Sequence, residues 1–170
     1  MRTGKLLAPI VASAFGLMLG PAPALAANPV TYYDITYGRS YERGTITWYN
    51  QSVGISHTLY AASDCRMARF YTTDANSKVF DSAVVNACSG AAKGYFSLQA
   101  DAAGGAYYTW VFFYEDNSSD SSTYVKYVRC RRGGERPCTY GPAAFSADDP
   151  AAAVLRNAGA LAATGAGGRS

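Results

Sequence analysis

Ala106-Tyr107-Tyr108-Thr109-Trp110-Val111-Phe112-Phe113-Tyr114 is the stretch of sequence that decides the fold. It contains neither a charge nor a glycine or proline, and aromatic and β-branched residues dominate it, which is typical of a strand. Successive side chains of a strand point to opposite faces, and here both sets are apolar or aromatic. We therefore expect either a central strand covered on both sides or a core strand with one face exposed for binding.

Six further runs of strand-forming residues lie between Thr45 and Cys130, and each is closed by turn residues such as Asn, Asp, Ser or Gly. The runs are residues 45–49, 57–60, 66–73, 79–85, 94–100 and 123–130. Seven runs spaced about 8–14 residues apart are typical of a sandwich or barrel. The sequence therefore predicts an all-β fold, an immunoglobulin-like or related β-sandwich of about seven strands, over residues 45–141.

Two segments flank this predicted domain. Residues 27–44 are rich in tyrosine, and we expect an ordered arm or an additional edge strand there. Residues 142–170 are rich in Ala and Gly, and we expect a short helical or disordered tail there. Asp148-Asp149-Pro150 is a helix-start signal, and a short helix after it would carry one apolar stripe. The residues of that stripe are Val154, Leu155, Ala158 and Leu161.

Residues 1–26 have the pattern of a cleavable secretory signal peptide. Arg2 and Lys5 supply the positive start, and Ala24-Leu25-Ala26 has the small-residue pattern that signal peptidase accepts. The uncharged stretch between them is about 15 residues long, shorter than the roughly 20 that a spanning helix needs. We expect cleavage after Ala26, a secreted, extracellular chain and no membrane span in the mature protein.

The four cysteines predict two disulfides, because an even count in an exported chain is typical of paired cysteines. Three pairings are possible. We favour Cys65–Cys88 with Cys130–Cys138, since each closes a loop of modest length between neighbouring elements. No C-x-x-C pair exists and His57 is the only histidine, so no metal site is predicted.

Charge and motifs limit the classes of function. Of the 15 basic side chains two lie in the leader, which leaves 13 against 12 acidic ones and a net charge of +1, too small for a nucleic-acid binder. His57 would be the base of a Ser-His-Asp triad, but no G-x-S-x-G pattern marks a nucleophile. We therefore expect His57 at an exposed strand position and not in a catalytic site. Glu42 and Glu115 are the possible pair for glycoside hydrolysis, but no motif joins them. We predict no enzyme and no cofactor.

Two groups of residues are candidate binding sites. The first is a cationic patch held by the Cys130–Cys138 loop, which would contact phosphate or carboxylate polymers such as anionic cell-wall glycans. Its residues are Arg129, Arg131, Arg132 and Arg136. The second is a flat aromatic platform that would stack on sugar rings. Its residues are Trp48, Tyr107, Tyr108, Trp110 and Tyr114.

Two resemblances add to this picture. Residues 44–55, followed by Ser63-Asp64-Cys65-Arg66 and Cys88, resemble small secreted β-sandwich proteins of filamentous actinomycetes of the Streptomyces type. That group has no settled function, so the resemblance assigns no site residues. Residues 161–165, Leu-Ala-Ala-Thr-Gly, are similar to the L-A-x-T-G signal of actinomycete sortases, but the hydrophobic segment and basic tail that follow such signals are replaced by residues 166–170.

These observations favour a secreted non-enzymatic module that contacts a cell-surface polymer or a protein partner. The alternative is a secreted protease inhibitor or a small hydrolase. An inhibitor would present Arg131 or Arg132 to the specificity pocket of a trypsin-like protease.

Overall fold

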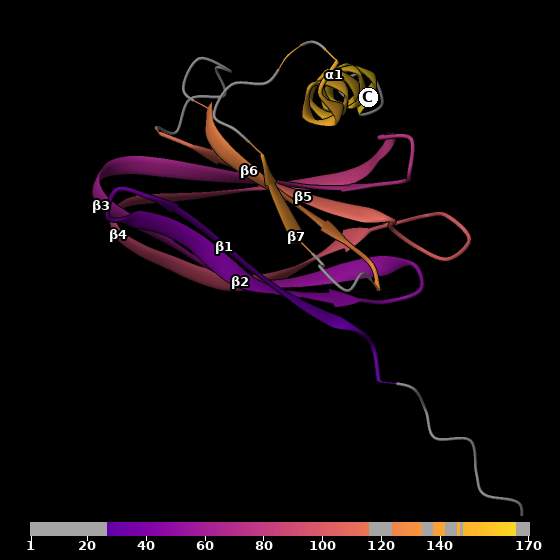
Figure 1. The fold of residues 1–170 in the computed structure, drawn as a ribbon, viewed down its shortest axis with the longest axis horizontal. Coiled ribbons are helices and arrows are strands. Elements are labelled where there is room, and N and C mark those ends of the chain that lie inside the picture. Colours follow the sequence, from indigo (N-terminus) through magenta and orange to yellow (C-terminus); the bar gives the residue numbers. More distant parts are fainter. Residues whose placement is uncertain (1–26, 116–123, 134–137, 142–145, 147, 166–170) are drawn as a thin grey trace, which may run out of the picture.

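The computed structural model describes residues 27–115, 124–133, 138–141, 146 and 148–165. Within these residues seven antiparallel strands and one helix form the fold (Figure 1). They are β1 (Val30–Tyr37), β2 (Ser40–Trp48), β3 (Ser52–Thr73), β4 (Val79–Gln99), β5 (Tyr108–Tyr114), β6 (Tyr124–Arg131), β7 (Cys138–Gly141) and α1 (Pro150–Gly165).

Two long strands organise the sheet. β3 and β4 span 22 and 21 residues and pair with each other along almost their whole length. β2 pairs with the first half of β3, whereas β5 pairs with its second half. The register shifts between Ala61 and Cys65, where Asp64 and its counterpart Ser89 both have positive φ. This bulge bends the strand, so one sheet supplies two facing layers.

The main core lies between the two layers, which Figure 1 shows as two crossing sets of strands. The first layer comprises β1, β2 and the adjoining halves of β3 and β4, and it contributes Ile46, Ile55 and Leu98. The second layer contributes Phe70 and Val111, among others. β1 lies close to β6 and β7, so the sheet is nearly closed. The predicted all-β fold is confirmed.

The helix α1 covers the outer side of the second layer, as Figure 1 shows. Asp149 caps it by accepting a hydrogen bond from the Ala151 amide at 2.8 Å. Val154 is buried and packs with Trp110 and Phe112 in a second core. The predicted helix is therefore confirmed. Of the two alternatives for the strand within residues 106–114, the structure shows the first, because β5 is covered on both sides. The Leu-Ala-Ala-Thr-Gly segment lies within α1.

The disulfide pairing is confirmed as Cys65–Cys88 and Cys130–Cys138. Cys65 and Cys88 are cross-strand partners on β3 and β4 at the bulge, and Cys130 and Cys138 are partners on β6 and β7. Two disulfides fit an extracellular protein. Across the described residues, no helix has the length and apolar character needed to cross a membrane. Residues 1–26, the predicted signal peptide, lie outside the described part of the chain.

Candidate functional site

Three arginines of the predicted cationic patch lie in the described part of the chain, and each contacts neighbouring groups. The Arg129 guanidinium lies over the rings of Tyr108, at 4.9 Å, and Trp110, at 5.4 Å. Arg131 lies 5.0 Å from the ring centre of Tyr107. Two of these cations on β6 therefore lie against aromatic rings of β5 and of the residue just before it.

Arg132 has a different role from the other two. Its guanidinium donates hydrogen bonds to the Gly104 carbonyl and to the Asn50 side chain, so it braces the loop before β5. Arg136 lies outside the described residues. The structure thus shows three separate engagements for the described arginines.

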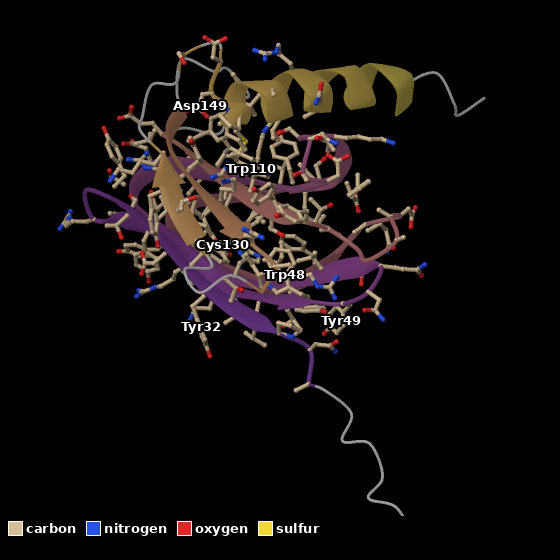
Figure 2. The ribbon with its side chains drawn as sticks, turned by 45° about the vertical axis from the view of Figure 1, so that its right-hand side comes forward. Tyr32, Trp48, Tyr49, Trp110, Cys130 and Asp149 are labelled. Atoms are coloured by element: carbon tan, nitrogen blue, oxygen red, sulfur yellow. A yellow bond between two sulfur atoms is a disulfide. The ribbon has the colours of Figure 1, made fainter. Side chains whose placement is uncertain are left out.

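The residues predicted as an aromatic platform lie mostly in the two cores. Trp48 is buried between the layers, where its indole N–H donates to the Thr31 hydroxyl at 2.9 Å. Trp110 is only 1% exposed beneath α1 (Figure 2), and its N–H donates to the Thr73 hydroxyl at 3.1 Å. Tyr114 is also buried. The structure does not bring these rings together on an exposed face, because both sides of β5 are covered.

The exposed tyrosines lie elsewhere. We call the side of the first layer that points away from the core the outer face. Tyr32 on β1 is 74% exposed there, and Tyr95 on β4 is 63% exposed. Figure 2 shows Tyr32 and Tyr49 on the side of the molecule opposite α1. The alternation of β1 explains this placement, because the neighbours Thr31 and Tyr33 point into the core.

An open hollow of about 500 Å³ lies on the outer face. Tyr32 and Tyr140, which is 60% exposed, are its aromatic residues on the surface. The hollow is completed by Tyr33, Asp34, Arg43, Gly44, Thr45 and Thr58. Strand register explains how these residues meet, since Tyr32 pairs with Thr45 and Asp34 pairs with Arg43. Its volume falls within the usual range for small-molecule sites.

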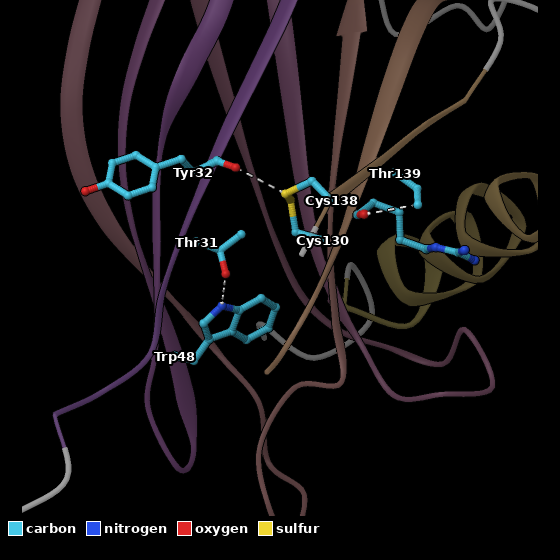
Figure 3. Close-up of a disulfide and its surroundings, with 7 residues drawn as sticks. Thr31, Tyr32, Trp48, Cys130, Cys138 and Thr139 are labelled. Carbon is cyan, nitrogen blue, oxygen red and sulfur yellow. Dashed lines mark hydrogen bonds between the residues drawn. A yellow bond between two sulfur atoms is a disulfide. The ribbon is translucent and has the colours of Figure 1, made fainter. Parts of the chain in front are cut away.

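The Cys130–Cys138 disulfide lies next to Tyr32, one of the residues of this hollow. The Cys138 sulfur lies 3.3 Å from the carbonyl oxygen of Tyr32 (Figure 3), so β7 lies against β1 at this point. Tyr140 follows two residues later on the same short strand. Lys126 adds a second link between β6 and β1 by donating to the Thr36 carbonyl at 3.0 Å. The disulfide therefore fixes the side of the hollow that Tyr140 forms.

A polar cluster lies on the core side of the same strands. The Tyr33 hydroxyl donates to Glu42 Oε1 at 2.8 Å, and His57 Nδ1 lies 3.9 Å from Glu42 Oε2. Glu42 is 0% exposed. Burial raises the pKa of the Glu42 carboxyl, although the contacts with His57 and Tyr33 oppose this shift. Burial, followed by the charge of Glu42, also raises the pKa of Tyr33.

This cluster corrects the prediction for His57. The histidine is buried, not exposed, because it occupies the core-facing side of β3 together with Ile55 and Leu59. Glu42 points into the core from β2, whereas Glu115 is exposed after the end of β5. A molecule in the hollow meets the opposite face of the strand that carries Glu42.

Comparison of the chain with protein-family models, characterised proteins and solved structures finds no significant match.

The two charged side chains of the hollow, Asp34 and Arg43, each contact a neighbouring residue. Asp34 accepts a hydrogen bond from the Thr36 hydroxyl at 3.0 Å. The Arg43 guanidinium lies 3.8 Å from the ring centre of Tyr41, and a hydrogen bond with Tyr41 raises the Arg43 pKa. Among the described residues no three His, Cys, Asp or Glu side chains gather into a metal site. The hollow thus offers aromatic rings, hydroxyls and one charge of each sign.

The residues of this hollow were not among the predicted site residues. A signal was present, since Tyr32-x-Asp34 and Arg43-x-Thr45 alternate in phase with core residues on two neighbouring strands. Tyr140 carried no such signal, because β7 is only four residues long.

Proposed function

We propose that the protein is a secreted, non-enzymatic module that binds polysaccharide in the hollow between Tyr32 and Tyr140. The observation that carries this proposal is the juxtaposition of two exposed tyrosines with a floor of charged and hydroxyl side chains. Exposed large aromatic residues that gather at a concave site are typical of binding surfaces.

The chemistry of the hollow matches that of a sugar ring. A pyranose has an apolar C–H face, which packs on an aromatic ring, and a rim of hydroxyls, which donate and accept hydrogen bonds. Asp34 accepts such bonds, Arg43 donates them, and Thr45 and Thr58 do both. Since exposed charged contacts contribute only about 0.2–1 kcal/mol each, the tyrosines supply most of the affinity in this proposal.

The site is also prepared before a ligand arrives. The disulfide holds β7 beside β1, and the two tyrosines project from paired strands that are already ordered. A ring that is held in place loses less conformational entropy on binding than a ring on a loose segment. This supports specific binding by a surface with few contacts.

Binding to polysaccharides tests the proposal directly. The purified protein is incubated with cell-wall preparations, cellulose, chitin and an acidic polysaccharide, and retention on each is measured. We expect retention on at least one polymer, and we expect Tyr32→Ala and Tyr140→Ala each to weaken it about tenfold or more. Tyr37→Ala is the matched control, because Tyr37 is an exposed tyrosine outside the hollow. The proposal is refuted if the protein is retained on none of the polymers, or if Tyr32→Ala and Tyr140→Ala are retained as well as the Tyr37→Ala control.

Secretion forms part of the same proposal. The leader pattern of residues 1–26 supports export, and the two disulfides agree with an oxidising compartment. N-terminal sequencing of protein recovered from culture medium should find Ala27 as the first residue. Full-length protein retained in the cell would contradict this part.

A further inference from the structure

We infer that the binding surface continues from the hollow across β2 and β3 to Tyr95 on β4, and that its ligand is a linear acidic polysaccharide lying across the strands. This inference rests on the proposed function and names its substrate class. It is carried by three observations on the outer face: a row of aligned side chains, a second tyrosine site, and a row of charges.

The first observation is the alignment of side chains across four strands. Tyr32 pairs with Thr45, Thr45 pairs with Ser56, and Ser56 pairs with Tyr95. Directly paired residues point to the same side of a sheet, so these four form one row on the outer face. Three strand spacings of about 4.8 Å separate the two tyrosines by about 14 Å. The row thus has an aromatic ring at each end and small hydroxyl side chains between them.

The second observation is that Tyr95 lies against Tyr49 and the backbone of β3. A hydrogen bond with Tyr49 raises the pKa of the Tyr95 phenol. Gly54 lies directly beneath this pair, and a Cβ at that position would be 2.5 Å from the Tyr95 hydroxyl and 3.0 Å from Tyr49 Cε2. The glycine therefore allows the two phenols to lie against the backbone of β3. This arrangement gives the far end of the row a fixed aromatic site.

The third observation concerns charge. The next row of the outer face runs beside the first one, and its cross-strand partners are Asp34, Arg43, Thr58 and Lys93. Two cations and one carboxylate give this row a net charge of +1. Lys93 is exposed, and Arg43 is exposed on the floor of the hollow. A polymer that lies along the aromatic row therefore passes cations on two different strands, and this favours carboxylated sugars over neutral ones.

Because the rows run across the strands, the affinity for a polysaccharide should depend on the length of its chain. A short oligosaccharide occupies only the hollow near Tyr32. A longer one also reaches Tyr95, and the two contacts then act together because they belong to one ligand. Affinity should rise with chain length until the ligand spans both tyrosines, and it should then level off.

The test uses size series from three acidic polysaccharides, polygalacturonate, alginate and hyaluronan, with cello-oligosaccharides as the neutral series. Binding to the purified protein is measured by calorimetry. We expect at least one acidic series to bind more tightly than the neutral series, with an affinity that falls as salt is added. We expect Tyr95→Ala to lose about tenfold in affinity for the long members of that series and nothing for the short ones.

Two further variants sharpen this test. Gly54→Ala keeps both tyrosines but displaces the Tyr95 phenol, so it should resemble Tyr95→Ala for long ligands. Lys93→Gln should weaken acidic ligands only, and Lys78→Gln is its matched control, because Lys78 is an exposed lysine in the turn between β3 and β4. Melting temperatures establish that each variant is folded.

The outcomes separate the inference from the proposed function. If Tyr32→Ala abolishes binding while Tyr95→Ala and Gly54→Ala bind long ligands like the wild type, the extended row is wrong and the hollow stands. If the neutral series binds as tightly as every acidic series, the assignment to acidic polymers is wrong. If neither tyrosine affects binding, both the inference and the proposed function fail.

Discussion

Replacing Tyr33 by Phe should destabilise the protein by an amount that depends on pH. The substitution removes one hydroxyl and leaves the ring, so the core between the layers keeps its packing. What is lost is the 2.8 Å hydrogen bond to Glu42 Oε1, on a carboxyl group that is fully buried. The other oxygen of Glu42 has no hydrogen-bond partner, and His57 Nδ1 lies 3.9 Å from it.

The magnitude follows from the charge of the acceptor. A hydrogen bond to a charged group contributes about 1.5–3 kcal/mol, and one to a neutral group contributes about 0.5–1.5 kcal/mol. We therefore expect a loss of about 2 kcal/mol where Glu42 is ionised and about 1 kcal/mol where it is protonated. For the roughly 120 residues that the structure describes, the larger loss lowers the melting temperature by about 8 °C.

The sign of the pH dependence follows from the raised pKa of Glu42. A carboxyl whose pKa is higher in the folded state contributes stability that is fully present below its unfolded pKa and is lost as the pH rises through the folded value. Removing the Tyr33 donor takes a favourable contact from the carboxylate and raises this pKa further. The stability of Tyr33→Phe should therefore fall more steeply with pH than that of the wild type.

Urea denaturation from pH 3 to pH 9 measures both effects. The control is Glu42→Gln, in which a neutral amide accepts the same hydrogen bond. In that background Tyr33→Phe should cost about 1 kcal/mol at every pH. A loss in the Tyr33→Phe single variant that is the same at all pH values, or no loss, would refute the reasoning that the hydroxyl stabilises a buried charge.

The remaining predictions concern the two disulfides and the N-terminal cap of α1. Replacing Cys130 and Cys138 by Ser should lower stability by about 2.5 kcal/mol, since they are eight positions apart in the sequence. It should also weaken polysaccharide binding, because Tyr140 loses its position. Replacing Cys65 and Cys88, which are 23 positions apart, should cost about 3.4 kcal/mol in stability and leave binding unchanged. Urea denaturation measures the stability of both double variants, and the retention assay measures their binding. If both double variants lose the same amount of binding, β7 does not position Tyr140 in the way proposed. Asp149→Ala should cost about 1–2 kcal/mol, because it removes the cap of α1 and an acceptor for the Tyr127 hydroxyl; a variant that melts like the wild type would show that the cap is dispensable.

The strands and the disulfides were predictable because their signals are local. Period-two alternation and closing turn residues located most of the strand residues, and an even cysteine count predicted two bridges. The connections between the strands were harder to predict from the sequence. Ser63-Asp64 has the composition of a reversing turn, yet it forms a bulge, and the two predicted runs on either side of it belong to the single strand β3. The same composition serves both structures, and only pairing with β4 decides between them.

The candidate site was not predictable to the same degree, because exposure depends on tertiary packing. Trp110 and Tyr32 both lie in alternating, tyrosine-rich segments, and nothing local distinguishes them. Trp110 is buried because α1 packs on its face, whereas Tyr32 is exposed because the outer face has no such cover in the described structure. The arrangement of the two layers and the helix had to be known before the aromatic residues could be assigned to core or surface.

The composition of the two sheet faces gives a physical reason for this difference. The face beneath α1 presents Phe112 and Trp110 with buried Val154 of the helix against them, so its apolar area requires a covering element. The outer face alternates its tyrosines with Thr45, Ser56 and charged side chains, which remain hydrated without a cover. An exposed aromatic ring among hydroxyl groups keeps one apolar face in contact with water. A ligand that has both an apolar face and hydroxyls gains the most binding free energy by covering that face.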